Sequence, residues 1–121
     1  MAEILVLGAG GMGVSLAVMA QKAGHRVTVW TPFEEEADLL RRTREHKKLL
    51  QGVKIPEEID FDTRIPGRMD LAIVATPSFA VRETSRQLAA AAPARVPAAC
   101  VSKGLEPGTL KDMAQVMGEE L

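Results

Sequence analysis

The sequence predicts an α/β domain with a mostly parallel sheet and helices on both faces. Three observations predict it. A short apolar run at residues 4–7 precedes a cluster of glycines, an Ala-rich segment follows that cluster, and further apolar runs alternate with helical segments. The 121 residues suffice for one such domain and are too few for two ordinary ones. We therefore expect a single domain over residues 1–121.

The first 30 residues predict a strand, a helix and a second strand. Residues 4–7 are wholly apolar, which is typical of a buried strand. The segment up to Ala23 predicts a helix whose small residues, at positions 13, 17, 20 and 24, share one face and allow close packing on the sheet. Gly24 is expected just beyond the helix end. Residues 26–30 are rich in β-branched and aromatic side chains and predict the second strand.

A second helix is predicted after this unit. Thr31 is expected as its N-cap, Pro32 as its first residue and Glu34 as its third. Acidic residues lie near the predicted start and basic ones near the end, so the charges complement the helix dipole. They are Glu34, Glu35 and Glu36 at the start, and Arg41, Arg42, Arg44, Lys47 and Lys48 at the end.

The middle of the chain gives weaker signals. Residues 46–57 are predicted to be irregular, and residues 58–61 to form a short third strand. Residues 63–68 contain a proline and a glycine and are too few for a full crossover helix.

The last third repeats the alternation of strand and helix. Residues 71–75 predict a buried strand that ends at a Thr-Pro-Ser loop, with a helix from there to about Ala91. Residues 96–101 predict another strand, with Pro97 near its start or at a sheet edge. Thr109 and Asp112 are expected to open a last helix.

Composition and charge exclude several classes of protein. Fifteen Lys and Arg stand against 16 Asp and Glu, a formal net charge of −1, so nucleic acid and anionic membranes are not expected partners. No apolar stretch approaches the roughly 20 residues of a membrane span, and no basic segment precedes the first apolar run, so we expect a cytoplasmic location. Cys100 is single and predicts a buried apolar thiol. No metal-ligand cluster is evident.

The glycine cluster Gly8-Ala9-Gly10-Gly11-Met12-Gly13 carries the clearest chemistry. It follows a predicted strand and opens a predicted helix, the context in which a GxGxxG motif binds a dinucleotide in a Rossmann-type fold. Gly8 permits the tight turn, Gly10 lets the backbone approach a pyrophosphate, and Gly13 lets helix and strand pack closely. N–H groups at the helix start then face the phosphate charge.

The sequence leaves the choice between NAD and NADP open. Dinucleotide folds often place an acid after the second strand to bind the adenosine ribose, but Thr31 and Pro32 stand there, with neither a carboxylate nor a guanidinium. We favour NAD, with NADP as the alternative, because the neighbouring glutamates repel an extra phosphate. Phe33 is predicted either to cover the adenine or to face the core at the start of the second helix.

Three loops should meet at the carboxyl edge of the sheet: the glycine loop, residues 76–81 and residues 102–108. Lys103 is the cation expected beside the nicotinamide, although from position alone an exposed loop lysine is almost as good an interpretation. His25 is expected in a solvated turn at the opposite edge, and His46 beyond the second helix. No Ser/His/Asp arrangement or pair of carboxylates in a cleft is evident.

The chain resembles the N-terminal domain of NAD(P)-dependent glycerol-3-phosphate dehydrogenases over nearly all of its length. The resemblance rests on VLGAGGMG at 6–13, GHRVTVW at 24–30, EHKKLLQGVKIPEEI at 45–59, VATPSFAVRE at 74–83 and SKGLEPGT at 102–109. Gly11 and Met12 depart from it, because the family usually has a small polar residue and an aromatic there. The family's aromatic after the proline-led motif falls at Phe79 or Ala80.

The resemblance implies specific roles. Lys103 would contact both substrate and cofactor, and the other cofactor contacts would be Gly8, Gly10, Gly11, Met12, Gly13, Phe33, Pro77 and Phe79. The complete enzyme would interconvert dihydroxyacetone phosphate, a phosphorylated triose, and glycerol 3-phosphate, as a homodimer. An α-helical C-terminal domain, which would carry a second lysine as general acid/base, is expected but absent from these 121 residues. This chain alone would then be inactive.

Two other functions are kept open. β-Hydroxyacid dehydrogenases often have a glycine loop that ends in Met-Gly, as here, but they do not explain the motif at residues 103–108. A non-catalytic nucleotide-sensing module would bind the cofactor without a role for Lys103.

Overall fold

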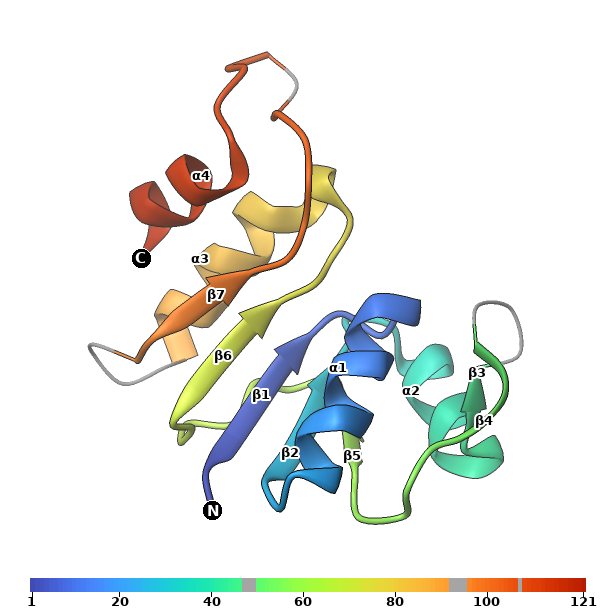
Figure 1. Ribbon diagram of the computed structural model, residues 1–121. Helices are drawn as coiled ribbons and strands as arrows, with labels where there is room; N and C mark the ends of the chain where they lie inside the picture. The colour runs from blue at the N-terminus through green and yellow to red at the C-terminus, as the bar shows by residue number, and fades with distance from the viewer. Residues whose placement is uncertain (47–49, 92–95, 107) are drawn as a thin grey trace.

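The computed structural model describes residues 1–46, 50–91, 96–106 and 108–121. A five-stranded sheet with the strand order β5-β2-β1-β6-β7 forms its centre, and every pair of neighbouring strands in it is parallel (Figure 1). The strands are β1 (Glu3–Leu7), β2 (Arg26–Trp30), β5 (Asp60–Asp62), β6 (Leu71–Val74) and β7 (Ala98–Cys100). The predicted parallel sheet is thus confirmed.

Helices cover both faces of this sheet, as predicted. Helices α1 (Gly11–Lys22) and α2 (Glu34–Thr43) lie on one face, and α3 (Val81–Ala91) and α4 (Met113–Glu120) on the other (Figure 1). Alternate side chains of β1 enter two separate cores, because successive residues of a strand point to opposite faces. Ile4 and Val6 pack with α1 and α2, whereas Leu5 and Leu7 pack with α3 and α4.

The backbone ladder brings the loops after neighbouring strands to the same edge. The Gly8 N–H donates to the Trp30 carbonyl at 2.8 Å, and the Ala75 N–H donates to the Leu7 carbonyl at 2.8 Å. Hydrogen bonding therefore continues to the points where the chain leaves β1, β2 and β6. The central strands therefore end at the same edge of the sheet, and the loops that follow them lie close enough to form one site.

The start of α2 differs from the prediction. The helix begins at Glu34, and its N-cap is Phe33 rather than Thr31, with no side-chain capping bond. The Thr31 hydroxyl is engaged elsewhere: it donates to Glu36 and accepts from the Phe33 N–H. The predicted acidic first turn is correct, and Arg41 and Arg42 lie in the last turn; Lys47 and Lys48 lie outside the described residues.

The segment after α2 is more regular than predicted. A two-stranded antiparallel sheet joins β3 (Glu45–His46) to β4 (Leu50–Lys54), so the expectation of an irregular stretch over residues 46–57 was wrong. The third strand of the main sheet, β5, starts two residues later than expected. Residues 63–68 form no helix, as predicted, and Ile65 in this loop packs against the core on the α3 and α4 face of the sheet.

Two elements in the last third of the chain are shorter than predicted. A 3-10 turn, η1 (Ser78–Ala80), precedes α3, and β7 covers only three residues after Pro97. Cys100 is half-buried on this edge strand rather than fully buried. Asp112 is the N-cap of α4 through a capping box with Gln115, whereas Thr109 stays in the preceding loop and donates to Glu106 at 2.6 Å.

Candidate functional site

A cleft of about 600 Å³ lies at the carboxyl ends of the strands. Segments that follow β1, β2, β6 and β7 line it. The three predicted loops are all present, and the segment after β2 adds a fourth wall. The β2 segment and the β6 and β7 loops lie on opposite sides of the glycine loop, because β1 lies between β2 and β6 in the sheet. The cleft therefore has two halves with the glycine loop between them.

The glycine loop has two positions that tolerate no side chain. An added Cβ at Gly8 would lie 2.6 Å from the Ala75 carbonyl oxygen, and one at Gly13 would lie 2.1 Å from the Gly8 carbonyl oxygen. Gly8 also has a φ of +129°, which L side chains rarely adopt. Gly10 is different, because an added Cβ there meets nothing within 4 Å. The backbone at Gly10 borders open space on the cleft.

The start of α1 offers unpaired donors to this space. Gly10 is the N-cap, no side chain caps the helix, and its first turn holds no acid. Because the first N–H groups of a helix have no partner within it, they carry partial positive charge toward the cleft. Open space at Gly10 and an uncapped helix of 12 residues fit a phosphate or pyrophosphate group.

The cleft half after β2 holds a buried threonine and a glutamate. Thr31 is 1% exposed, and its hydroxyl donates to the Glu36 Oε1 at 2.7 Å and accepts from the Phe33 N–H at 3.3 Å. Glu36 belongs to the first turn of α2, and it lines the cleft together with Thr31 and Phe33. This bond fixes a carboxylate beside the end of β2.

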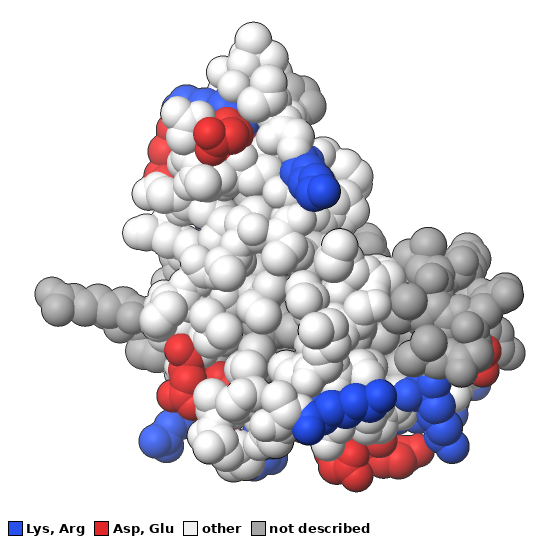
Figure 2. Space-filling model, viewed as in Figure 1, with Lys and Arg blue, Asp and Glu red and all other residues white. Residues whose placement is uncertain are grey.

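The rim of the cleft is apolar. Phe33 on one half and Phe79 on the other are 64% and 79% exposed, and Met12 is also exposed on the glycine loop. Phe33 therefore does not face the core, which was one of its two predicted positions. Figure 2 shows charged side chains along the lower edge and at the upper end of this view, with a largely uncharged centre between them.

The loop after β6 adds Thr76 and Pro77 to the cleft lining. Thr76 is buried, and its hydroxyl has no hydrogen-bond partner in the described part of the chain. Its carbonyl oxygen accepts a hydrogen bond of 2.5 Å from the Ser102 hydroxyl, which joins this loop to the one after β7. The two loops of this half therefore form one connected wall.

Lys103 follows Ser102 directly and lines the cleft. Its side chain is exposed, and no hydrogen bond or ion pair engages its ammonium group among the residues described. It is also the one Lys or Arg among the described residues that line the cleft. The next residue, Gly104, has a φ of +110° and lies against Ser78. The loop thus presents one exposed cation beside the β6 half of the cleft.

A cluster of ion pairs, which we call the Arg82 cluster, holds the loop that contains Lys103 and Glu106 against α3 and α4. Arg82, at the start of α3, donates to both carboxylate oxygens of Glu106 at 2.7 and 2.8 Å and to Glu120 of α4 at 2.7 Å. Glu119 accepts from Arg82 at 3.0 Å and pairs with Lys111. The hydrogen bonds from Arg82, with help from Thr109, hold the pKa of Glu106 at about 2, well below its ordinary value of 4.5. The same bonds raise the pKa of Arg82.

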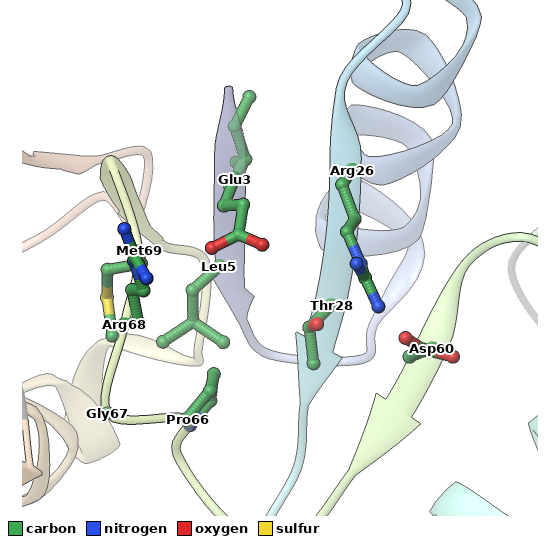
Figure 3. A pocket seen from close by; sticks show the side chains of 10 residues that line it. Glu3, Leu5, Arg26, Thr28, Asp60, Pro66, Gly67, Arg68 and Met69 are labelled. Atoms are coloured by element: carbon green, nitrogen blue, oxygen red, sulfur yellow. The ribbon is translucent and has the colours of Figure 1, made fainter. Parts of the chain in front are cut away.

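A second hollow of about 310 Å³ lies near the amino ends of β1 and β2 (Figure 3). Four charged side chains line it: Glu3, Arg26, Asp60 and Arg68. Arg26 points toward Asp60 in this view, but the side chains of the four make no ion pair with one another or with other described residues. The formal charges of the two acids and two bases therefore sum to zero.

Other candidate groups lie away from the cleft. His25 is half-buried near the amino end of the sheet, where its Nδ1 accepts from the Ala2 N–H at 3.0 Å. The His46 side chain lies outside the described part of the chain. Across residues 1–46, 50–91, 96–106 and 108–121, no group of three or more His, Cys, Asp or Glu side chains could hold a metal ion. None of the described helices is long and apolar enough to cross a membrane.

Comparison with known families decides the affiliation. Residues 3–121 match the family model described as the N-terminus of NAD-dependent glycerol-3-phosphate dehydrogenase. The chain belongs to this family. The predicted resemblance is thereby confirmed, and the glycine loop, the β6 loop and the Lys103 loop lie within the matched region.

Curated members of the family are longer than this chain. A glycerol-3-phosphate dehydrogenase [NAD(P)+] of Lactobacillus delbrueckii is 42% identical over 124 residues, which cover 100% of this chain and 36% of that protein. One from Fusobacterium nucleatum is 35% identical and is covered to 37%. The chain therefore spans little more than a third of the length of these relatives.

Solved structures agree on the fold. Glycerol-3-phosphate dehydrogenase from Coxiella burnetii superimposes with a TM-score of 0.89 at 24% identity, over 99% of this chain and 38% of that one. The enzyme from Saccharomyces cerevisiae gives 0.78 at 19% identity, over 98% of this chain and 39% of that one. A 2-dehydropantoate 2-reductase from Enterococcus faecalis gives 0.74 at 18% identity, over 98% and 37%. At these identities the likeness concerns the fold.

The structure brings most of the predicted site residues to one cleft. The residues among them that line it are Gly8, Gly10, Gly11, Met12, Phe33, Pro77, Phe79 and Lys103. Gly13 lies beneath the loop and packs against Gly8. Sequence reasoning missed two arrangements, the Thr31–Glu36 bond and the Arg82 cluster. The first had a signal, because Glu36 lies in the first turn of the helix that follows the second strand. The second joins residues too far apart in sequence to be paired by inspection.

Proposed function

We propose that residues 1–121 form one cofactor-binding domain of an NAD(P)-dependent dehydrogenase that interconverts dihydroxyacetone phosphate and glycerol 3-phosphate. The observation that carries the proposal is the position of Lys103. Among the described residues lining the cleft it is the one cation, and it stands on the family motif at residues 102–109, across the glycine loop from Glu36. The family match supports the same assignment.

Each wall of the cleft has a part in cofactor binding. The uncapped start of α1 and the backbone at Gly10 would hold the pyrophosphate, because free N–H groups and open space coincide there. Gly8, Gly11, Met12 and Gly13 would shape this loop. Phe33 would cover the adenosine half, and Pro77 and Phe79 the nicotinamide half, because exposed apolar side chains at a cleft rim favour flat, apolar ring faces.

Lys103 would act on the substrate oxygen. The bound cofactor supplies hydride transfer to or from the central carbon of the triose. Negative charge develops on the carbonyl oxygen during reduction, and the Lys103 ammonium would donate a hydrogen bond to it. The apolar rim would limit the entry of water and so strengthen this interaction. By the family resemblance, the group that transfers the proton would belong to a helical domain outside these 121 residues.

Cofactor binding and turnover test the proposal separately. Trp30 is the single tryptophan and lines the cleft, so energy transfer from it to a reduced nicotinamide reports binding to the 121-residue chain. We expect binding without turnover. The complete gene product should oxidise reduced cofactor with dihydroxyacetone phosphate, and size-exclusion chromatography should find a homodimer. Turnover of a 3-oxo acid instead would favour a β-hydroxyacid dehydrogenase, and binding without any turnover a nucleotide-sensing module.

A further inference from the structure

No acidic residue follows β2 directly in the sequence, but a glutamate from the next helix lies beside the end of this strand. Dinucleotide folds that bind NAD commonly place a carboxylate there for the adenosine ribose hydroxyls, whereas this chain has Thr31 and Pro32. A carboxylate is nevertheless present in space, because Glu36 reaches back from the first turn of α2 to the Thr31 hydroxyl at 2.7 Å. We propose that Glu36, held by Thr31, binds the adenosine ribose and makes this site selective for NAD(H) over NADP(H). The inference rests on the proposed function.

The location of Glu36 supports this role. It lines the cleft on the β2 side of the glycine loop, next to Phe33 and opposite the half that contains Lys103. With the pyrophosphate at the start of α1 and the nicotinamide beside Lys103, the adenosine must occupy the β2 half. Glu36 is half-buried, whereas its helix neighbours Glu34 and Glu35 are exposed. Of these three acids, Glu36 lines the cleft and the other two do not.

Thr31 fixes the carboxylate in a useful state. The buried hydroxyl donates to one oxygen, Oε1, and is itself oriented by the Phe33 N–H. A carboxylate has two oxygens and about four acceptor sites, so Oε2 remains available for ribose hydroxyls. Because Thr31 is 1% exposed and held by the sheet, the carboxylate is positioned before any ligand arrives. Preorganisation of this kind reduces the entropy lost on binding.

The charges of this half disfavour a 2′-phosphate. A phosphate monoester carries a charge of about −1.5 to −2 at neutral pH, and its binding sites usually contain arginine or lysine. Among the described residues that line the cleft, the one cation is Lys103, which lies on the other side of the glycine loop. A 2′-phosphate would therefore meet the Glu36 carboxylate, with no compensating cation among the described residues that line the β2 half. Both the repulsion and the lost ribose hydrogen bond act against NADPH.

Titration of the 121-residue chain with NADH and with NADPH tests the inference, with Trp30 energy transfer as the readout. We expect NADH to bind at least about tenfold more tightly, since two charged groups held within a cleft interact strongly. Glu36→Gln should weaken NADH binding and bring the NADPH-to-NADH ratio of dissociation constants close to 1. Glu35→Gln is the matched control, because it removes the same charge from the same helix turn outside the cleft, and it should keep the wild-type ratio.

Two further measurements do not depend on Glu36→Gln. Thr31→Val keeps the carboxylate but releases it, so NADH affinity should fall several-fold while NADPH stays excluded. In the wild-type chain, raising the salt concentration should narrow the preference for NADH, because screening weakens the repulsion of the 2′-phosphate. Circular dichroism checks that each variant is folded.

The outcomes distinguish a wrong assignment of Glu36 from a wrong proposed function. Equal binding of both cofactors by the wild-type chain, or a Glu36→Gln chain that keeps the full preference for NADH, overturns the assignment of Glu36 and leaves the proposed function standing. Binding of neither cofactor at millimolar concentration overturns the proposed function, and the inference with it. A preference for NADH that Glu36→Gln removes and Glu35→Gln preserves supports both.

Discussion

The two ends of the parallel sheet carry two hollows with opposite chemistry. The cleft at the carboxyl ends is lined by backbone, small residues and apolar side chains, with one glutamate and one lysine in separate halves. The hollow near the amino ends is half as large and is lined by two acids and two bases (Figure 3). Parallel strands point all their carboxyl ends the same way, so the loops that leave them can converge on one ligand. Strand polarity, rather than the amount of charge, therefore decides which hollow can bind a dinucleotide.

The glycine loop should give the largest effects, and two neighbouring glycines should separate folding from binding. Gly13→Ala places a Cβ 2.1 Å from the Gly8 carbonyl oxygen, an obstacle in the backbone that cannot rotate away. We expect a loss of about 3 kcal/mol in the free energy of unfolding, the upper end for overpacking, and loss of cofactor binding. Urea denaturation and Trp30 energy transfer measure the two quantities.

Gly10→Ala is the matched contrast in the same loop. Its Cβ meets nothing within 4 Å, so the free energy of unfolding should fall only by about 0.5–1 kcal/mol, the difference between glycine and alanine at an N-cap. Cofactor affinity should fall by about tenfold or more, because the methyl group enters the space expected for the pyrophosphate. A variant with unchanged affinity would mean that the phosphates do not approach Gly10.

Lys103→Ala should reduce turnover of the complete gene product by about 100-fold or more, because the variant lacks the positive charge beside the reacting oxygen. Lys22→Ala is the control, since Lys22 ends α1 far from the cleft. Steady-state kinetics with dihydroxyacetone phosphate measure both variants. If Lys103→Ala kept normal kinetics, Lys103 would have no place in the reaction.

Glu106→Gln should have a smaller effect on the same reaction. It breaks the bidentate pair with Arg82 and frees the loop that carries Lys103, while Lys103 itself stays intact. We expect kcat to fall by about tenfold, since modest misplacement of a group in a reactive site has effects of this order. NMR titration of the lysine side chains in the 121-residue chain would distinguish a misplaced Lys103 from an unfolded chain. A freed loop sharpens the Lys103 signals while the chain stays folded.

The same pair makes a prediction on pH. The pKa of Glu106 is lowered from 4.5 to about 2 in the folded chain, so folding is stabilised when Glu106 is ionised. This stabilisation is fully present above pH 4.5 and is lost as the pH falls from there toward 2. Urea denaturation at a series of pH values should therefore show a smaller loss of stability in this window for Glu106→Gln than for the wild type.

The hollow at the amino ends should give the smallest effects. Arg26→Ala and Asp60→Ala remove charges that make no ion pair within the described residues, so each should change the free energy of unfolding by about 0.5 kcal/mol or less. Cofactor affinity should not change. A clear loss of affinity in either variant would contradict the contrast between the two ends of the sheet.

Much of the fold could be predicted from the sequence because local signals and packing agree. The apolar runs at residues 4–7 and 71–75 are buried on both faces only if they form inner strands. The glycine cluster fits the turn between a strand and a helix. The start of α2 could not be predicted, because a capping threonine must accept from an N–H inside the helix, whereas the Thr31 hydroxyl oxygen accepts from the Phe33 N–H just before it. The same hydroxyl donates to the Glu36 carboxylate, which holds it at the end of β2.

The site was predictable where it depends on the ends of strands. Lys103 and the glycine loop follow apolar runs, so topology alone brings them together. The Arg82 cluster is different, since it joins α3, the loop after β7 and the end of α4, whose relative positions depend on tertiary packing. Glu106 and Arg82 are 24 residues apart, and no periodicity links them.

The two outermost strands, β5 and β7, have only three residues each. An exposed strand margin invites a neighbouring molecule to add its own backbone, and this is a common route to aggregation. Short edge strands leave few unpaired backbone amides for such an addition, and Pro97, just before β7, has no N–H to donate. The chain is thereby protected against polymerising through its sheet.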